Sequence, residues 1–251
     1  MIRRPLIAGN WKMYTTVMEA QQLAAAIVQA AGKAADRDVM IAPPYTALAA
    51  VSKVLSGSGV ILGAQNVHWE EKGAFTGEVS GGMLKDVGCK MVIIGHSERR
   101  QVFGETDFMI NRRIGGALQC GLIPVFCIGE TLKQREAGQT LKVLEGQIRA
   151  GLAGVKLTEG VQLVVAYEPV WAIGTGKTAT ETQAQEVHRF IRNLLCDIFE
   201  KNIADQLRIL YGGSVKPDNI DLLMRQDDID GALVGGAALK AESFERIICF
   251  H

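Results

Sequence analysis

The sequence lacks the features of secreted, membrane-spanning and metal-stabilised proteins. Its five cysteines are an odd number, widely spaced and without a C-x-x-C pair, which speaks against a disulfide framework and a zinc site. We therefore expect reduced thiols in a cytoplasmic protein. The N-terminal MIRRPLIAGNWK has two arginines but no apolar run of the kind that a secretory signal needs. No stretch approaches the roughly 18 uninterrupted apolar residues of a membrane span.

The sequence also has no excess of charge of either sign. Lys and Arg total 27, Asp and Glu total 27, and the formal net charge is zero. No segment is strongly one-signed, so we expect neither a nucleic acid nor a membrane as partner. Pro/Ser-rich linkers and breaks in composition are also absent, which predicts one domain over residues 1–251.

What the sequence does contain is a short apolar run that recurs eight times: PLIAGN, VMIAP, VILGA, MVIIG, LIPVFCIG, LVVAYEP, LRILYGG and GALVGG. Each run is apolar throughout, as strands buried on both faces are. Helix-like segments lie between the runs, and two of them open with capping boxes at Thr16–Glu19 and Thr180–Gln183. This alternation predicts an α/β fold, a closed (β/α)8 barrel of eight parallel strands with an outer ring of helices. An open doubly wound sheet is the alternative.

Polar residues and glycines gather where the apolar runs end. The carboxyl ends of parallel strands share one rim, which is where such proteins carry their chemistry. The rim residues are Asn10 and Lys12, His96 and Glu98, Glu168, Gly212–Gly213–Ser214, and Gly235–Gly236. The opposite rim shows no such set, so we predict an active site at the carboxyl ends.

Glu168 is a candidate general base. It ends an apolar run in VVAYEPVWAIGTGKTAT, and Pro169 restricts it to extended geometry, which aims the carboxylate. Enclosure could raise the pKa of a carboxylate in such a position toward the working pH. A structural ion pair is the alternative for a carboxylate at a strand end.

Three further rim residues have both a chemical and a structural interpretation. Lys12 could hold an anionic substrate, or it is a solvated surface charge. Asn10 either orients Lys12 or caps its own turn. If a helix begins at Ser97, its dipole disfavours imidazolium at His96, and a neutral ring could then polarise a substrate oxygen. The alternative for His96 is a structural role.

The glycine-rich segments predict a phosphate site and a lid. Phosphate sites of (β/α)8 proteins lie after the seventh and eighth strands, where both Gly-Gly pairs fall, although tight turns also use glycine. The segment Ile173–Lys177 follows a stiff Pro169–Trp171 entry and could close over a substrate. An ordinary glycine-rich connection is the alternative.

The connection Gln65–Ser80 (QNVHWEEKGAFTGEVS) is long for a compact barrel. Trp69 and Phe75 on such a protruding loop would be costly in water, which predicts that the chain associates with itself.

Taken together, AGNWKM, IIGHSERR, AYEPVWAIGTGKTAT, YGGSV and LVGGAA resemble the triosephosphate isomerase family, in order and spacing and over essentially the whole chain. The resemblance implies interconversion of dihydroxyacetone phosphate and glyceraldehyde 3-phosphate through an enediol(ate), in glycolysis and gluconeogenesis, without cofactor or metal. It implies that Glu168 moves the proton between the two carbons. It also implies that neutral His96 polarises the carbonyl and moves protons between the oxygens. Lys12, placed by Asn10 and paired with Glu98, would steady the negative charge. Backbone N–H groups would hold the phosphate at Gly174, Ser214, Gly235 and Gly236.

The resemblance also implies a homodimer in which the Gln65–Ser80 loop, with Thr76 near its tip, inserts into the partner near Lys12. Tyr14 and Ala238 depart from residues common in the family, and Gly115–Gly116 interrupts a helix-like segment at roughly 1 kcal/mol each. Two other functions remain to be weighed. One is a catalytically silent barrel that binds a sugar phosphate or a protein, which would not need Glu168 and His96 together. The other is an aldolase, which would need a Schiff-base lysine or metal ligands.

Overall fold

The computed structural model describes residues 3–173 and 179–251, and its strands close into a barrel. The strands are β1 (Leu6–Asn10), β2 (Asp38–Ala42), β3 (Ile61–Ala64), β4 (Met91–Ile94), β5 (Ile123–Ile128), β6 (Val164–Tyr167), β7 (Arg208–Tyr211) and β8 (Gly231–Val234). Each strand pairs in parallel with the next, and β8 pairs with β1. The predicted closed barrel is confirmed, and the open doubly wound sheet is wrong.

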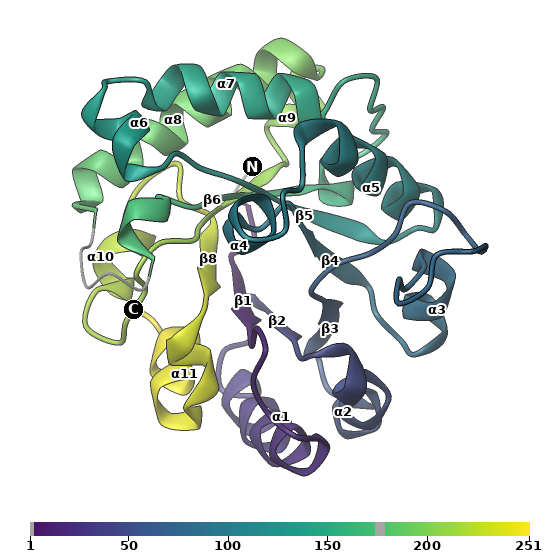
Figure 1. The fold of residues 1–251 in the computed structure, drawn as a ribbon. Coiled ribbons are helices and arrows are strands. Elements are labelled where there is room, and N and C mark those ends of the chain that lie inside the picture. The colour runs from purple at the N-terminus through teal and green to yellow at the C-terminus, as the bar shows by residue number, and fades with distance from the viewer. Residues whose placement is uncertain (1–2, 174–178) are drawn as a thin grey trace.

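Helices surround this ring of strands (Figure 1). They are α1 (Val17–Ala31), α2 (Leu48–Leu55), α3 (Gly81–Asp86), α4 (Ser97–Gln101), α5 (Asp107–Gln119), α6 (Leu132–Glu136), α7 (Thr140–Gly151), α8 (Glu181–Ile198), α9 (Lys201–Ala204), α10 (Ile220–Met224) and α11 (Ala241–Ile248). Short 3-10 turns are η1 (Tyr45–Ala47), η2 (Gly160–Gln162), η3 (Val170–Ala172) and η4 (Gly236–Leu239). The first and last helices, α1 and α11, lie side by side, so both ends of the fold meet at the β1–β8 seam. None of the helices in the described ranges is long and apolar enough to cross a membrane.

Local sequence signals explain where the two predicted helices begin. The Thr16 side chain accepts from the N–H of Glu19, and the Glu19 carboxylate accepts from the N–H of Thr16, which is a complete capping box. Thr180 and Gln183 make the same pair of bonds at the start of α8. Both predicted capping boxes are confirmed, and each satisfies N–H groups that the helix itself cannot pair.

The strand period of two fills the barrel with side chains. Alternate residues point inward and form one buried cluster, whose members are Leu6, Ala8, Met40, Ala42, Met91, Ile93, Val125, Cys127, Val164, Ala166, Leu210 and Leu233. Gly63 leaves room for Met40, because a Cβ at Gly63 would lie 1.9 Å from the Met40 methyl carbon. The barrel is therefore a packed core whose two ends carry whatever polar residues come next in the alternation.

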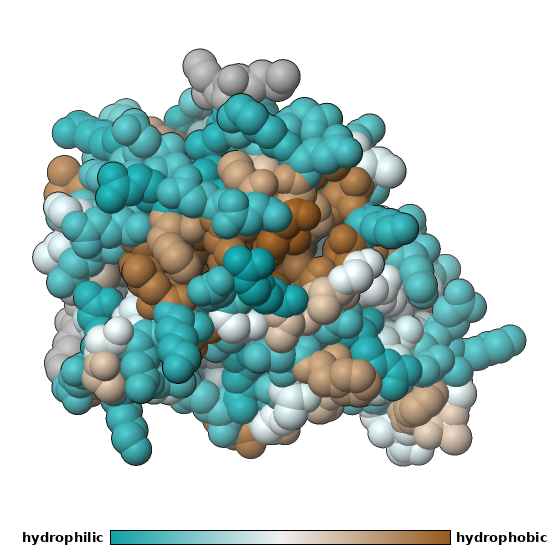
Figure 2. Space-filling model, turned by 90° about the horizontal axis from the view of Figure 1, so that it is seen from above, coloured by the Kyte–Doolittle hydropathy of each residue, from teal (hydrophilic) through white to brown (hydrophobic). Residues whose placement is uncertain are grey.

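A second, larger apolar cluster lies between the strands and the ring of helices. The outer face of that ring is mostly hydrophilic, as expected for helices that bury one side only. Figure 2, seen from above Figure 1, shows a group of hydrophobic side chains at the centre of such a face, bordered by hydrophilic ones. Leu141, Val187 and Phe190 line a surface hollow between α7 and α8, the helices at the top of Figure 1.

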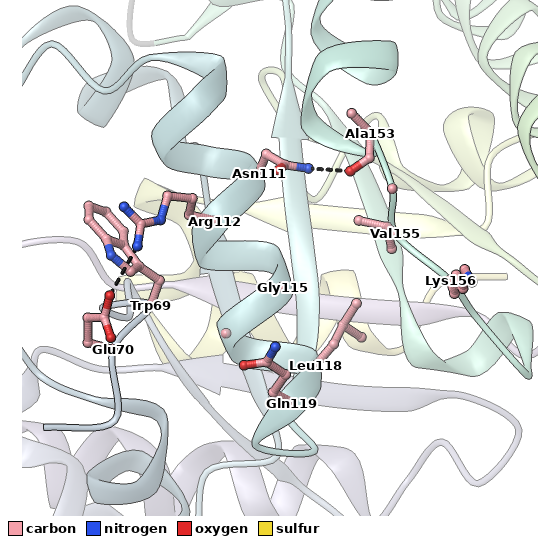
Figure 3. Close-up of a pocket in the computed structure, with 12 residues that line it drawn as sticks. Trp69, Glu70, Asn111, Arg112, Gly115, Leu118, Gln119, Ala153, Val155 and Lys156 are labelled. Atoms are coloured by element: carbon pink, nitrogen blue, oxygen red, sulfur yellow. Dashed lines mark hydrogen bonds and ion pairs between the residues drawn. The ribbon is translucent and has the colours of Figure 1, made fainter.

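The first part of the long Gln65–Ser80 connection packs against its own chain, whereas residues 71–78 are exposed. Trp69 is only partly exposed, with the Arg112 guanidinium 4.6 Å from its ring centre, and Glu70 forms an ion pair with Arg112 (Figure 3). Of the two aromatic residues predicted to lie on a protruding loop, Trp69 is partly covered by α5 of its own chain, whereas Phe75 remains exposed. A Cβ at Gly116 would lie 2.8 Å from the Trp69 Cα, so the second glycine of the Gly115–Gly116 pair permits this contact.

Candidate active site

The strand alternation carries two of the predicted site residues onto the inner face of the barrel. Asn10 continues the inward series Leu6 and Ala8, and Glu168 continues Val164 and Ala166. Both are buried at the carboxyl ends of their strands, where the hydrophobic filling stops. This is why a buried asparagine and a buried carboxylate face the same end of the barrel.

A cavity of about 380 Å³ opens at this end. Its lining consists of Asn10, Lys12, Tyr14, His96, Glu168, Ile173, Gly212, Gly213, Ser214, Val215, Lys216, Leu233, Gly235, Gly236, Ala237 and Leu239. The structure thus brings together seven of the nine predicted site residues, Asn10, Lys12, His96, Glu168, Ser214, Gly235 and Gly236. Glu98 does not line the cavity but contacts Lys12, which does. Gly174 and most of the predicted lid lie outside the described residues.

Glu168 is held by two hydrogen bonds and is 2% exposed. Its Oε1 lies 2.9 Å from His96 Nε2, and its Oε2 accepts the backbone N–H of Ser97 at 2.8 Å. Three glycines make room for this residue and the proline after it. A Cβ at Gly129 would lie 1.7 Å from the Glu168 carbonyl oxygen, one at Gly212 3.0 Å from its Cγ, and one at Gly213 2.9 Å from Pro169 Cγ.

His96 caps α4, which begins at Ser97, so the condition for a dipole effect on His96 is met. Its Nδ1 accepts the backbone N–H of Glu98 at 3.3 Å, so the ring proton lies on Nε2 and points toward Glu168. Burial alone would lower the pKa of His96, but the Glu168 carboxylate, with Glu98 beside it, raises that pKa above its usual value. The helix dipole was expected to lower the pKa of His96. The pKa is raised instead, because the Glu168 carboxylate in contact with the ring outweighs the dipole.

Lys12 has an unusual backbone and two positioning contacts. Its φ is +51°, in the left-handed region that non-glycine residues seldom adopt. The Asn10 side chain accepts the Lys12 N–H at 3.0 Å, and the Gln65 side chain donates to the Lys12 carbonyl at 2.8 Å. The Lys12 ammonium donates to Glu98 at 2.8 Å. The bond from the Lys12 N–H to the Asn10 side chain both caps the turn and places Lys12. The two roles considered for Asn10 are therefore one.

The predicted phosphate end of the cavity is formed by backbone rather than by large side chains. Ser214 follows β7, and Gly235 and Gly236 stand at the start of η4. A Cβ at Gly236 would meet nothing within 4 Å, so this backbone is open to the cavity. Ala238, which departs from the family's usual serine, is fully buried and lies behind the cavity, near Gly9.

Sequence reasoning missed three residues that support the site. Gln65 holds the Lys12 carbonyl, the Ser97 N–H holds Glu168, and Glu130 organises the entry to the predicted lid. Glu130 follows β5 by two residues, so the rule that polar residues at strand ends matter would have found it. Gln65 directly follows β3, so the same rule would have found it as well. Ser97 gives no such signal, since it acts through its backbone N–H.

Glu130 is fully buried and binds the residues on either side of Glu168. The Tyr167 hydroxyl donates to it at 3.1 Å and the Trp171 indole N–H donates at 2.9 Å. The Arg135 guanidinium lies 3.3 Å from Glu130 and 4.4 Å from the Trp171 ring centre. The stiff entry predicted at Pro169–Trp171 is therefore anchored by a charged cluster.

In residues 3–173 and 179–251, no group of three His, Cys, Asp or Glu side chains is placed to hold a metal ion. Burial raises the pKa of the Cys127 thiol well above its usual value, so this residue packs inside the barrel as a neutral group.

A closed parallel barrel with a cavity at the carboxyl ends of its strands, lined by the predicted site residues, places this chain among the TIM-barrel enzymes. A family model for triosephosphate isomerase matches residues 5–251. The triosephosphate isomerase of Syntrophotalea carbinolica is 56% identical over 99% of both chains, and that of Chloroflexus aurantiacus is 55% identical over the whole of both. The crystal structure of triosephosphate isomerase from Bartonella henselae, 38% identical, superposes with a TM-score of 0.87 over 97% of each chain.

The chain belongs to the triosephosphate isomerase family. It is an isomerase that interconverts dihydroxyacetone phosphate and glyceraldehyde 3-phosphate in glycolysis and gluconeogenesis, which confirms the resemblance in its motifs. The silent barrel and the aldolase are thereby set aside.

Proposed function

We propose that Glu168 is the base of this isomerisation. It takes a proton from the carbon next to the substrate carbonyl and returns it to the former carbonyl carbon, with an enediolate between the two steps. The observation that carries the proposal is the buried Glu168 carboxylate, aimed into the cavity 2.9 Å from the His96 ring nitrogen. A base held this firmly loses little orientation freedom when the substrate arrives.

In this proposal His96 exchanges protons with the two substrate oxygens. Its Nε2–H now points at Glu168, and a substrate oxygen that enters between them would receive that hydrogen bond instead. That oxygen would separate the ring from Glu168 Oε1, whose charge raises the pKa of His96, while the Ser97 N–H still holds Glu168 Oε2. The Glu98 N–H still occupies Nδ1. The ring would then react as a neutral imidazole, able to donate to one oxygen and recover a proton from the other.

Lys12 and the backbone at the far end of the cavity would bind the negative charges. The Asn10 side chain holds the Lys12 backbone, and the Lys12 ammonium, paired with Glu98, would face the developing enediolate. The N–H groups of Ser214, Gly235 and Gly236 would take the phosphate, together with Gly174 of the predicted lid. Preorganised donors of this kind stabilise charge as it forms without having to reorient.

A coupled assay tests the base. Purified protein is supplied with glyceraldehyde 3-phosphate, without added metal, and dihydroxyacetone phosphate is measured. We expect full turnover from the wild-type chain and almost none from Glu168→Gln, a neutral isostere. A Glu168→Gln variant that turns over at the wild-type rate would remove Glu168 from the role of base.

We further propose that the chain works as a homodimer through the Gln65–Ser80 loop. Phe75 remains 42% exposed on that loop, Thr76 next to it is exposed, and so are Met13 and Tyr14 beside the cavity. Apolar surface of this kind at two places is suited to reciprocal burial in a symmetric pair. Gln65, the first residue of the loop, holds the Lys12 carbonyl, so docking of the loop would also support the site.

The cytoplasm is the compartment we propose for this enzyme. Glycolytic substrates are found there, and the cysteines at positions 89, 120, 127, 196 and 249 are all free. Free thiols are typical of a reducing compartment.

A further inference from the structure

The opposite end of the barrel holds a second cavity, of about 400 Å³, that the isomerisation does not use. It lies at the amino ends of the strands, since its lining includes the first residues of five of them. These residues are Asp38 of β2, Ile61 of β3, Met91 of β4, Ile123 of β5 and Arg208 of β7. Strand alternation points each of them inward, so the cavity is the lower mouth of the barrel.

The floor of this cavity is apolar. Met91 belongs to the filling of the barrel, and Ile61 and Ile123 pack against that filling from below. Val161, on η2 at the side, is 49% exposed. A concave surface with these side chains can take a short hydrocarbon body out of water.

Cations outnumber carboxylates in the lining. The lining holds Arg3, Arg4, Lys90 and Arg208 against Asp38 and Asp205. Arg3 has a further partner outside the lining, since its Nε lies 2.6 Å from Asp230 Oδ1. Asp38 is shared, because its Oδ1 accepts from Arg4 Nε at 2.7 Å and its Oδ2 from Arg208 Nη1 at 2.7 Å. The exposed Lys90 ammonium has no carboxylate within reach in the described part of the chain.

Arg208 is the most telling of these groups. Its side chain is only 11% exposed, yet among the described residues its guanidinium bonds to Asp38 alone. A guanidinium has five N–H donors, and one so nearly buried ordinarily finds acceptors for more of them. Arg208 lines the cavity, and none of its nitrogens is among the buried unpaired atoms of the described residues, so its remaining donors are accessible. A planar guanidinium with free donors suits a second carboxylate.

We propose that this cavity binds a small organic anion, a carboxylate on a short apolar body. Arg208 and Lys90 hold the carboxylate, while Ile61, Met91 and Ile123 cover the body. The anion supplies the negative charge that Asp38 cannot give to both arginines and the lysine. Because the site opens at the end of the barrel opposite Glu168, its occupation leaves the catalytic cavity free.

The test uses the full chain labelled with [methyl-13C]methionine, hexanoate as the probe, and saturating inorganic phosphate to occupy the catalytic phosphate site. The Met91 methyl signal, assigned with Met91→Leu, should shift and saturate, while Met13 and Met18 stay in place. Acetate lacks the body and 1-hexanol lacks the charge, so each should bind at least about tenfold more weakly.

Variants locate the charge contacts. Arg208→Lys keeps the charge but loses the fork and should weaken hexanoate binding about tenfold. The exposed Lys90→Glu should weaken it about fivefold without affecting the fold. Lys142→Glu, an equally exposed change on α7, should leave it unaltered. Shifts that never saturate, shifts at Met13 in place of Met91, or equal affinity in Arg208→Lys, Lys90→Glu and wild type would each overturn the proposal.

Discussion

At the scale of single residues, the length of the Glu168 side chain is the most sensitive feature of the proposed site. Glu168→Asp keeps the carboxylate but withdraws it by about one bond, and a displacement of about 1 Å can cost on the order of 100-fold in rate. We therefore expect turnover to fall about 100-fold in the coupled assay. The free energy of unfolding in urea should stay close to that of the wild type.

A matched variant controls for the effect of shortening a glutamate by one methylene. Glu186 on α8 is exposed, so Glu186→Asp makes the same shortening away from the cavity and should leave turnover unchanged. If Glu168→Asp also keeps a near-normal rate, the carboxylate does not work from this position.

His188 gives a second residue-scale prediction, on stability and pH. It is fully buried on α8, and burial lowers its pKa to about 3. The unfolded chain binds a proton near pH 6.5 that the folded chain does not, so this group destabilises the fold as the pH falls between about 6.5 and 3. The expected slope is about 1.4 kcal/mol per pH unit. His188→Asn, which cannot titrate but can still donate to the Asp228 carbonyl, should lack this contribution.

Urea unfolding at pH 7, 6 and 5 measures the effect as a difference of slopes between the two proteins. His96 acts with the opposite sign, because its raised pKa adds stability at low pH that is lost as the pH rises through that pKa. Parallel pH profiles of wild type and His188→Asn would show that His188 is not held neutral by burial.

At the scale of elements, the two adjacent glycines of α5 offer a controlled pair. Glycine costs roughly 1 kcal/mol against alanine inside a helix. A Cβ at Gly115 would meet nothing within 4 Å, whereas one at Gly116 would lie 2.8 Å from the Trp69 backbone. Gly115→Ala should therefore raise the free energy of unfolding by about 1 kcal/mol. Gly116→Ala should lower it by about 1 to 2 kcal/mol, since overpacking outweighs the same gain in propensity.

Each variant is the control for the other, because both gain the same helix propensity. Equal stabilisation by the two substitutions would mean that Trp69 does not rest on α5 in solution.

The elements themselves could be predicted because their signals are local. Fully apolar runs identify buried parallel strands, and the Thr16 and Thr180 capping boxes fix the starts of two helices. The site positions followed from the rule that strand ends share a rim. Contacts between distant segments could not be predicted in this way, since no local pattern signals that Trp69 packs on Gly116 or that Gln65 reaches Lys12. The raised pKa of His96 was missed for the same reason, because its cause is Glu168, 72 residues away in the chain.

At the scale of the whole molecule, the proposed dimer would cover residues 71–78 of the loop, which are all exposed and include Phe75 and Thr76. Thr76→Glu tests this, because an exposed threonine of a monomer tolerates a charge within about 0.5 kcal/mol. At a dimer interface the same carboxylate would be buried without a partner, at about 3 kcal/mol or more. We expect light scattering to show a shift from dimer to monomer at micromolar concentration, with a fall in turnover.

Thr182→Glu is the control, since Thr182 is also exposed but lies in the first turn of α8, away from the loop. It should remain dimeric and fully active. The concentration series matters as much as the variant, because loss of a dimer by mass action is reversed at higher protein concentration, whereas misfolding is not. A wild-type chain that scatters as a monomer at every concentration and still turns over would refute the proposal that the Gln65–Ser80 loop completes a partner.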